Sequence, residues 1–178
     1  VLAVPPYPAE LARPWRPKGG GTLLVRPIRP EDAAAHAAAF RQVPPEDVRY
    51  RFFSPLKELS PAMVARLTQI DYDREMAFVA VRPRAGGGEE GVGVARLIRD
   101  GTESGEFAVV VLSAMKGQGL GSHLMRRLFD WARSVGMRRV EGQVLADNRP
   151  MLGFVRKLGF EVRASGEDPE VMEVWREV

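Results

Sequence analysis

The residues best suited to chemistry lie in a glycine-rich segment, Lys116–Ser122, which reads KGQGLGS. It follows an apolar run, Phe107–Leu112, and precedes leucines at helical spacing, so we expect it to join a buried strand to a helix. Glycine lets an anion approach the backbone closely, and the first N–H groups of a helix lack partners and attract negative charge. This combination predicts a binding site for a pyrophosphate.

Two common phosphate loops do not match this segment. A P-loop needs Gly-Lys-Ser/Thr after four spacer residues, which is missing here. The dinucleotide fingerprint needs glycine at its first, third and sixth positions, but counting from Gly117 the sixth residue is Ser122. The remaining alternative is a tight turn that binds nothing, although three glycines within residues 117–121 would be a costly way to build one.

The segments around the loop alternate between strand and helix patterns. We expect strands at 22–29, 76–82, 91–98, 107–112, 139–144, 160–164 and 171–178, and helices at 30–41, from 44, from 60, after the loop and at 150–158. This order predicts an α/β (α+β) domain with a mixed central sheet flanked by helices.

The first 21 residues have a different composition. Five prolines before residue 18 and the glycines at 19–21 predict an arm or linker without regular structure, whose removal leaves folding little changed. Residues 22–178 then form the domain. Three residues could pin the arm to it, namely Tyr7, Leu11 and Trp15. Because the chain begins at Val1 rather than at a methionine, we expect it to be a piece of a longer chain.

Composition excludes several classes of function. The net charge of +3 is small and scattered, which argues against nucleic-acid binding. No apolar run approaches the ~20 residues of a membrane span. Cysteine is absent, so disulfides are excluded, and a cytoplasmic location is expected. His36 and His123 have no second ligand at metal spacing, so we expect no metal site.

The glycine loop resembles the cofactor motif of GNAT N-acetyltransferases, Gln/Arg-x-x-Gly-x-Gly/Ala, with Lys116 in the first position. The resemblance continues at 25–32 (VRPIRPED), 148–151 (NRPM) and 157–160 (KLGF). A narrower resemblance, to the GNAT domain of bacterial Pat-type protein lysine acetyltransferases, is carried by 51–55 (RFFSP), 69–75 (QIDYDRE) and 106–111 (EFAVVV).

The resemblance implies a GNAT fold with a mostly antiparallel sheet, acetyl-CoA as cosubstrate, and the lysine of a protein as acceptor. The known targets of the Pat class are acyl-CoA synthetases, which are silenced by acetylation of an active-site lysine. In that class the domain is often fused to an acyl-CoA-synthetase-like or regulatory region, and residues 7–11 (YPAEL) are similar to the linker of the fused forms.

The implied cofactor site combines strand, loop and helix positions: Val110, Val111, Leu112, Lys116, Gly117, Gln118, Gly119, Leu120, Gly121, Ser122, Asn148 and Met151. Backbone N–H groups at 110–112 would polarise the thioester carbonyl, and the Asn148 side chain would hydrogen-bond the pantetheine. Val155 stands where many GNAT enzymes have a tyrosine that protonates the leaving thiolate, so the general acid is unassigned.

Glu106 is the expected general base. A lysine side chain with a pKa of about 10.4 is an ammonium ion at pH 7 and must lose a proton before it attacks. Glu106 begins the strand that leads into the loop, and matching Pat enzymes have a Glu base there, so we expect it partly buried beside the thioester. The alternative is a solvent-exposed glutamate at a strand end.

Three acidic residues before the second predicted strand, Asp71, Asp73 and Glu75, either attract a cationic substrate or form a solvated capping loop. Other functions also stay open. One is acetylation of a small amine or a protein N-terminus with the same fold and cosubstrate. Another is a non-catalytic module that senses acyl-CoA, although an intact loop beside Glu106 argues against it.

Overall fold

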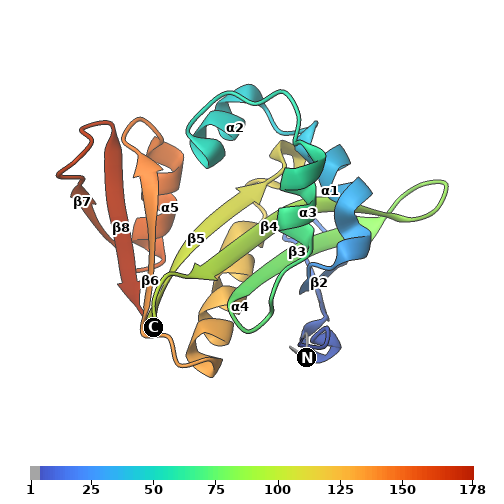
Figure 1. Ribbon diagram of the computed structural model, residues 1–178. Coiled ribbons are helices and arrows are strands. Elements are labelled where there is room, and N and C mark those ends of the chain that lie inside the picture. The colour runs from blue at the N-terminus through green and yellow to red at the C-terminus, as the bar shows by residue number, and fades with distance from the viewer. Residues whose placement is uncertain (1–4) are drawn as a thin grey trace.

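Eight strands form one sheet in the computed structural model, which describes residues 5–178 (Figure 1). Residues 1–4 of the predicted arm lie outside that range. The strands lie in the order β1 (Arg13–Trp15), β2 (Leu23–Pro27), β3 (Glu75–Pro83), β4 (Glu89–Arg99), β5 (Ser104–Val111), β6 (Arg139–Leu145), β8 (Val171–Glu177) and β7 (Glu161–Ala164). Every neighbouring pair is antiparallel except β5 and β6, which are parallel. The predicted mixed, mostly antiparallel sheet is therefore confirmed.

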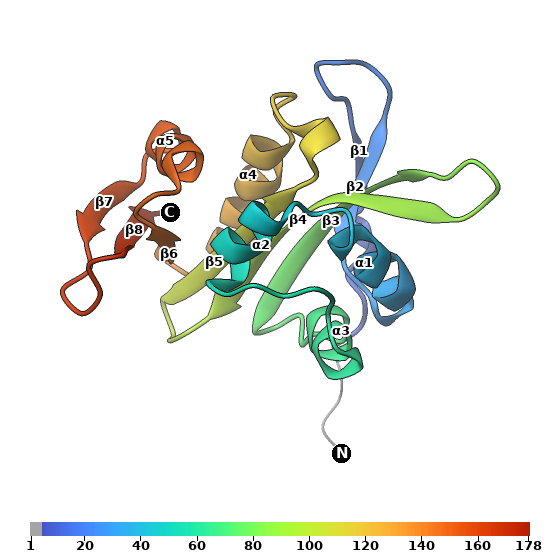
Figure 2. The same cartoon turned by 90° about the horizontal axis from the view of Figure 1, so that it is seen from above.

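Helices cover both faces of this sheet, as Figure 2 shows. One face carries α1 (Ala33–Phe40), α2 (Pro45–Phe52) and α3 (Pro61–Thr68), and the other carries α4 (Leu120–Ser134) and α5 (Arg149–Lys157). Three short 3-10 turns complete the elements, namely η1 (Ala9–Leu11), η2 (Pro30–Asp32) and η3 (Ser113–Met115). Because side chains alternate along a strand, β5 turns Phe107 toward the α4 face and Glu106 toward the face of α1–α3.

The expected sequence signals explain where α3 begins and which side of α4 is buried. Ser60 accepts a hydrogen bond from the Met63 N–H at 3.1 Å, and Pro61 occupies the first turn of α3, where it displaces no helical donor. In α4 the predicted stripe of Leu120, Leu124, Leu128 and Trp131 is buried, and it packs into the core with β3–β5. The stripe fixes α4, and with it the glycine loop, against the sheet.

The expectation that prolines preclude regular structure in the arm is wrong. Residues 13–15 form β1, in which Pro14 lies opposite Leu24 of β2. An edge strand tolerates proline because one of its sides needs no donor. The arm is pinned as its residue types suggested. Tyr7 donates its hydroxyl hydrogen to the Pro27 carbonyl at 2.7 Å, and Leu11 and Trp15 pack against the core.

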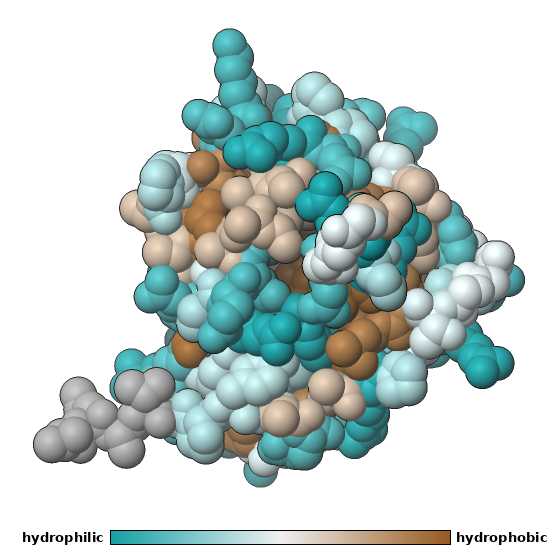
Figure 3. Space-filling view, turned by 90° about the vertical axis from the view of Figure 1, so that its right-hand side faces the viewer, coloured by the Kyte–Doolittle hydropathy of each residue, from teal (hydrophilic) through white to brown (hydrophobic). Residues whose placement is uncertain are grey.

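The surface of the side at the right of Figure 1 is mixed. Hydrophilic residues surround smaller apolar patches and hollows there (Figure 3). Within residues 5–178, no helix is long and apolar enough to cross a membrane.

Candidate functional site

Strands β5 and β6 run side by side over a short distance and then separate (Figure 1). They pair in parallel from Ser104 opposite Arg139 to Glu106 opposite Glu141. Beyond that pair, β5 continues to Val111 and β6 to Leu145 without pairing to each other. Backbone groups on the inner edge of β5 therefore face a gap instead of a neighbouring strand.

The hydrogen-bond pattern decides which β5 donors face the gap. Leu112 donates its N–H to the Val92 carbonyl at 3.0 Å, which directs it toward β4. Antiparallel pairs alternate, so the Val110 N–H also points to β4, whereas those of Val109 and Val111 point away from it. Of the predicted donors at 110–112, Val111 alone faces the gap. Val109, which the sequence analysis missed, faces it as well.

The glycine loop has the backbone shape that an anion site requires. Gly117 and Gly119 adopt φ values of +79° and +89°, where any other residue is strained. Gly119 caps α4 without a side-chain hydrogen bond, so the N–H groups of residues 120–122 have no acceptor within the helix. Gly121 serves packing instead, because a Cβ there would lie 3.3 Å from the Phe154 ring.

The side chains of Lys116 and Gln118 stabilise the loop through contacts with neighbouring residues. Lys116 Nζ lies 2.5 Å from Asp47 Oδ2 and so ties the loop to α2. Gln118 donates from its side-chain nitrogen to the Ala114 carbonyl at 3.2 Å. The free N–H groups and the glycine conformations make the backbone of the loop suited to a pyrophosphate.

Asn148 has a structural role in addition to the predicted hydrogen bond to the pantetheine. It is buried, and its side-chain oxygen accepts the Met151 N–H at 3.2 Å, which caps α5. Only the amide nitrogen is then available to a pantetheine carbonyl. Val155 is fully buried in the core between α5 and the sheet. No proton donor occupies that position.

Glu106 is exposed, and the expected partial burial is not found. It lies on the face of α1–α3, opposite Ile98 of β4 and Glu141 of β6. An arginine that the sequence analysis did not single out for the site, Arg51 of α2, is electrostatically coupled to it. Burial, aided by the positive charge of Arg96, lowers the pKa of Arg51 to about 10, and the negative charge of Glu106 opposes this shift.

The three predicted acidic residues do not form one surface. Glu75 is only 4% exposed, and its carboxylate contacts Arg66 at 2.8 Å and Arg96 at 3.0 Å. It therefore holds α3 and β4 together and is removed from the substrate set. Asp71 accepts the Asp73 N–H at 3.0 Å, so these two cap an exposed turn before β3.

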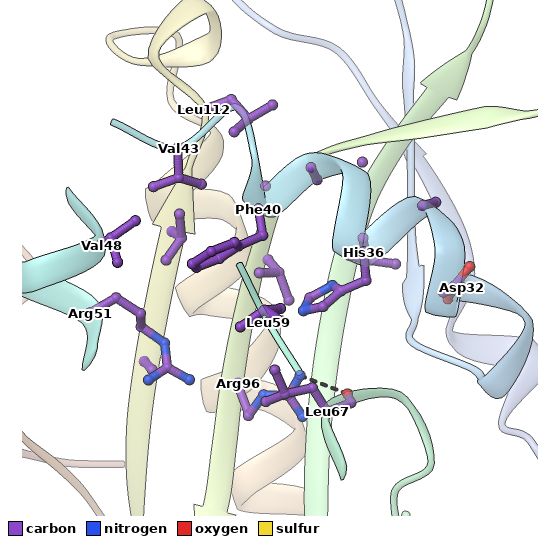
Figure 4. Close-up of a pocket in the computed structure, with 18 of the residues that line it drawn as sticks. Asp32, His36, Phe40, Val43, Val48, Arg51, Leu59, Leu67, Arg96 and Leu112 are labelled. Carbon is purple, nitrogen blue, oxygen red and sulfur yellow. Dashed lines mark hydrogen bonds between the residues drawn. The ribbon is translucent and has the colours of Figure 1, made fainter. Parts of the chain in front are cut away.

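A cavity of about 80 Å³ lies between α1, α2 and the sheet (Figure 4). Its walls are mostly apolar, and on the β5 side they include Ala108 and Val110, which lie on the same face as Glu106. His36 and Arg51 point inward from the helices, and Arg96 donates to the Leu67 carbonyl at 2.8 Å. Burial and the Arg96 charge lower the pKa of His36 to about 4, so it is neutral at pH 7. The cavity offers an apolar side chain a place close to Glu106.

Comparison with known proteins identifies the class. The profile of the Acetyltransferase (GNAT) family matches residues 45–160. An acetyltransferase of Pseudomonas aeruginosa is 35% identical over 150 residues, which cover 84% of this chain and 80% of that protein. The crystal structure of the GNAT domain of S. lividans Pat matches with a TM-score of 0.88 at 30% identity, covering 97% of this chain and 100% of that domain. Acetyltransferase Pat of Mycolicibacterium smegmatis is 28% identical over 148 residues, or 82% of this chain, and the match spans 43% of its length.

The fold and the family match define an acetyltransferase, and this fold implies acetyl-CoA as cosubstrate. The chain belongs to the GNAT acetyltransferase family. The narrower resemblance to Pat GNAT domains is also confirmed by sequence and by structure.

Proposed function

We propose that this chain transfers an acetyl group from acetyl-CoA to the side-chain amine of a lysine in a protein, with Glu106 as general base. The observation that carries the proposal is the position of Glu106. It is the last β5 residue paired with β6, and its side chain is exposed on the face where the cavity lies. The likeness to the S. lividans Pat domain over its whole length supports a protein acceptor.

Acetyl-CoA supplies the acetyl group as a thioester, which a neutral amine can attack. The ammonium form cannot attack, so the chain must provide a proton acceptor within reach, directly or through one water. Glu106 takes the proton that the amine nitrogen loses. The N–H groups of Val109 and Val111 face the gap and can stabilise an oxygen that gains negative charge.

The two ends of the cosubstrate site have different tasks. The N–H groups of residues 120–122, at the start of α4, hold the pyrophosphate, and the Asn148 amide nitrogen donates to the pantetheine. With Val155 buried in the core, no acid is assigned to the departing sulfur. A thiol of pKa about 8.5 is acidic enough to leave as the thiolate, so this step does not require one.

The proposal is tested by incubating the chain with acetyl-CoA and purified acyl-CoA synthetases, the targets expected for a cytoplasmic enzyme of this kind. Peptide mass spectrometry should find acetylation at one active-site lysine, at a rate that falls when Glu106 is replaced by glutamine. A synthetase in which that lysine is arginine should stay unmodified. Acetylation at the uncatalysed rate with every protein acceptor would overturn the proposal.

One observation favours a second acceptor class, a small amine that carries a carboxylate. Among residues 5–178, Arg51 has no carboxylate within 4.0 Å, and it points into the cavity (Figure 4). A carboxylate placed there would offset the cost of a buried cation. Acetylation assays with apolar amino acids and with their amides distinguish the two acceptor classes, because the amides lack the carboxylate. Acetylation of the amino acids but not of the amides, and its loss in Arg51→Met, would favour the small amine.

A further inference from the structure

The N-terminal arm lies against the glycine loop, although they are about a hundred residues apart in the chain. The Lys18 N–H donates to the Gln118 carbonyl at 3.3 Å. A Cβ built on Gly119 would lie 3.7 Å from Trp15 Cζ2 and 3.8 Å from Lys18 Cε. The end of the Lys18 side chain is therefore beside the glycine that begins α4.

Several contacts fix this part of the arm. The Trp15 ring stacks on the His123 imidazole of the first α4 turn, with centroids 5.0 Å apart and planes inclined by 15°. Arg127 of α4 donates to the Leu11 carbonyl, and β1 pairs with β2 up to Trp15. Lys18 follows three residues after this paired strand, so the pairing of β1 fixes the position of its backbone.

Two lysines lie in or beside the loop, and they differ in whether a carboxylate is paired with them. Lys116, which occupies the first position of the motif, is already paired with Asp47 at 2.5 Å. Lys18 is exposed and, within the part of the chain that the structure describes, has no carboxylate within ion-pair distance. Helix N–H groups bind an anion without supplying a full positive charge, whereas a pyrophosphate carries negative charge that a nearby ammonium group stabilises.

We propose that Lys18 is a cosubstrate-binding residue that contacts the pyrophosphate of CoA, and that residues 13–18 of the arm form one wall of the CoA site. The Lys18 side chain reaches the loop at Gly119, whereas the Lys116 side chain is held by Asp47 of α2. The inference goes beyond the proposed acceptor and base, because it concerns the phosphate end of CoA alone.

The test is calorimetric titration of the full chain with CoA, without any acceptor. Lys18→Gln keeps much of the side-chain length but removes the charge, and it should weaken binding about tenfold, the effect of losing one charge-assisted hydrogen bond. Lys18→Arg should retain most of the affinity. Arg84→Gln, which removes a charge from the exposed β3–β4 loop, is the matched control and should bind as the parent does. Equal affinities of Lys18→Gln and Arg84→Gln would overturn the proposal.

A second titration separates the phosphates. CoA that lacks its 3′-phosphate still contains the pyrophosphate, so Lys18→Gln should lose about as much affinity for it as for CoA. A loss seen only with complete CoA would assign Lys18 to the 3′-phosphate and contradict the contact proposed here. Thermal melting of each variant shows whether it is folded. Because no acetyl transfer is measured, a negative result leaves the role of Glu106 intact.

Discussion

Glu106 and Glu141 are the last residue pair at which β5 and β6 lie side by side. The next residues of the two strands, Phe107 and Gly142, pack closely against each other. A Cβ on Gly142 would lie only 2.6 Å from Phe107 Cε1, so the Phe107 ring takes up the space over Gly142 that a side chain would need. Beyond the Glu106–Glu141 pair the two strands continue without pairing to each other, which leaves an opening between them. The Glu106 carboxylate lies at the narrow end of this opening, and the N–H groups of Val109 and Val111, which point away from β4, lie along its edge.

Replacing Glu106 with glutamine tests the proposed base. The amide keeps the shape of the side chain but cannot accept a proton, and general-base assistance contributes about 10²–10⁴-fold. Turnover at pH 7 should fall by that factor, while calorimetric affinity for acetyl-CoA stays unchanged. Activity should partly recover at high pH, where more of the acceptor amine is already neutral.

The control for this variant is Glu161→Gln, which removes an exposed carboxylate from β7, an edge strand that β8 separates from β6. It should retain full turnover. If Glu106→Gln also retains near-normal turnover at pH 7, Glu106 is not the base. Glu141 is then the next candidate, since burial and its neighbour Asp100 raise the pKa of that carboxyl and it lies opposite Glu106.

Replacing Gly119 with glutamate tests the cosubstrate loop. The substitution places a negative side chain beside Trp15 and the start of α4, at a backbone φ of +89°. Binding of acetyl-CoA should be lost, as measured by calorimetry. Gly87→Glu is the matched control, because Gly87 also has a positive φ, +107°, but lies in the β3–β4 loop with open space around it. Unchanged binding in Gly119→Glu would move the cosubstrate to another site.

Local patterns in the sequence were sufficient to predict most helices and strands and the position of the glycine loop. The glycines, the α4 leucines and the Ser60–Pro61 start of α3 each depend on neighbouring residues, so their spacing predicts the structure. The separation of β5 from β6 begins after Glu106 and Glu141, which no local pattern connects.

The other features that the sequence did not predict depend on contacts between residues far apart in the chain. Glu75 looks like part of an exposed acidic group until Arg96, on the next strand, is known to lie against it. Proline interrupts most strands. Pro14 is tolerated in β1 because that strand lies at an edge of the sheet. The two carboxylates opposite each other, Glu106 and Glu141, become neighbours only through the parallel pairing.

Deleting residues 1–20 should destabilise the protein, contrary to the expectation for a loose arm. The deletion removes β1 from the edge of the sheet and uncovers the core surface on which Leu11 and Trp15 pack. Burying one large apolar side chain contributes about 1.5–3 kcal/mol, so the melting temperature should fall by several degrees or more. Differential scanning calorimetry measures this. A melting temperature equal to that of the parent would show that the arm contributes nothing to the fold.

His36 should make stability depend on pH in mildly acidic solution. Its folded-state pKa of about 4 lies below the unfolded value of about 6.5, because the imidazole is buried near Arg96 and Arg51, with Asp32 opposing the shift. Above pH 6.5 both states are neutral and the group has no effect. As pH falls from 6.5 toward 4, the unfolded state binds the proton first and stability is lost, by at most about 3 kcal/mol.

The measurement compares His36→Gln, which cannot titrate in this range, with the parent by urea unfolding at pH 7 and pH 4.5. Carboxylates such as Asp32, whose pKa is lowered by its hydrogen bond to Arg26, weaken both proteins in acid. The difference between them therefore isolates the imidazole. The parent should lose more free energy of unfolding between the two pH values than the variant does. Equal losses would mean that the His36 ring is solvated, and the cavity would then be open to water at this position.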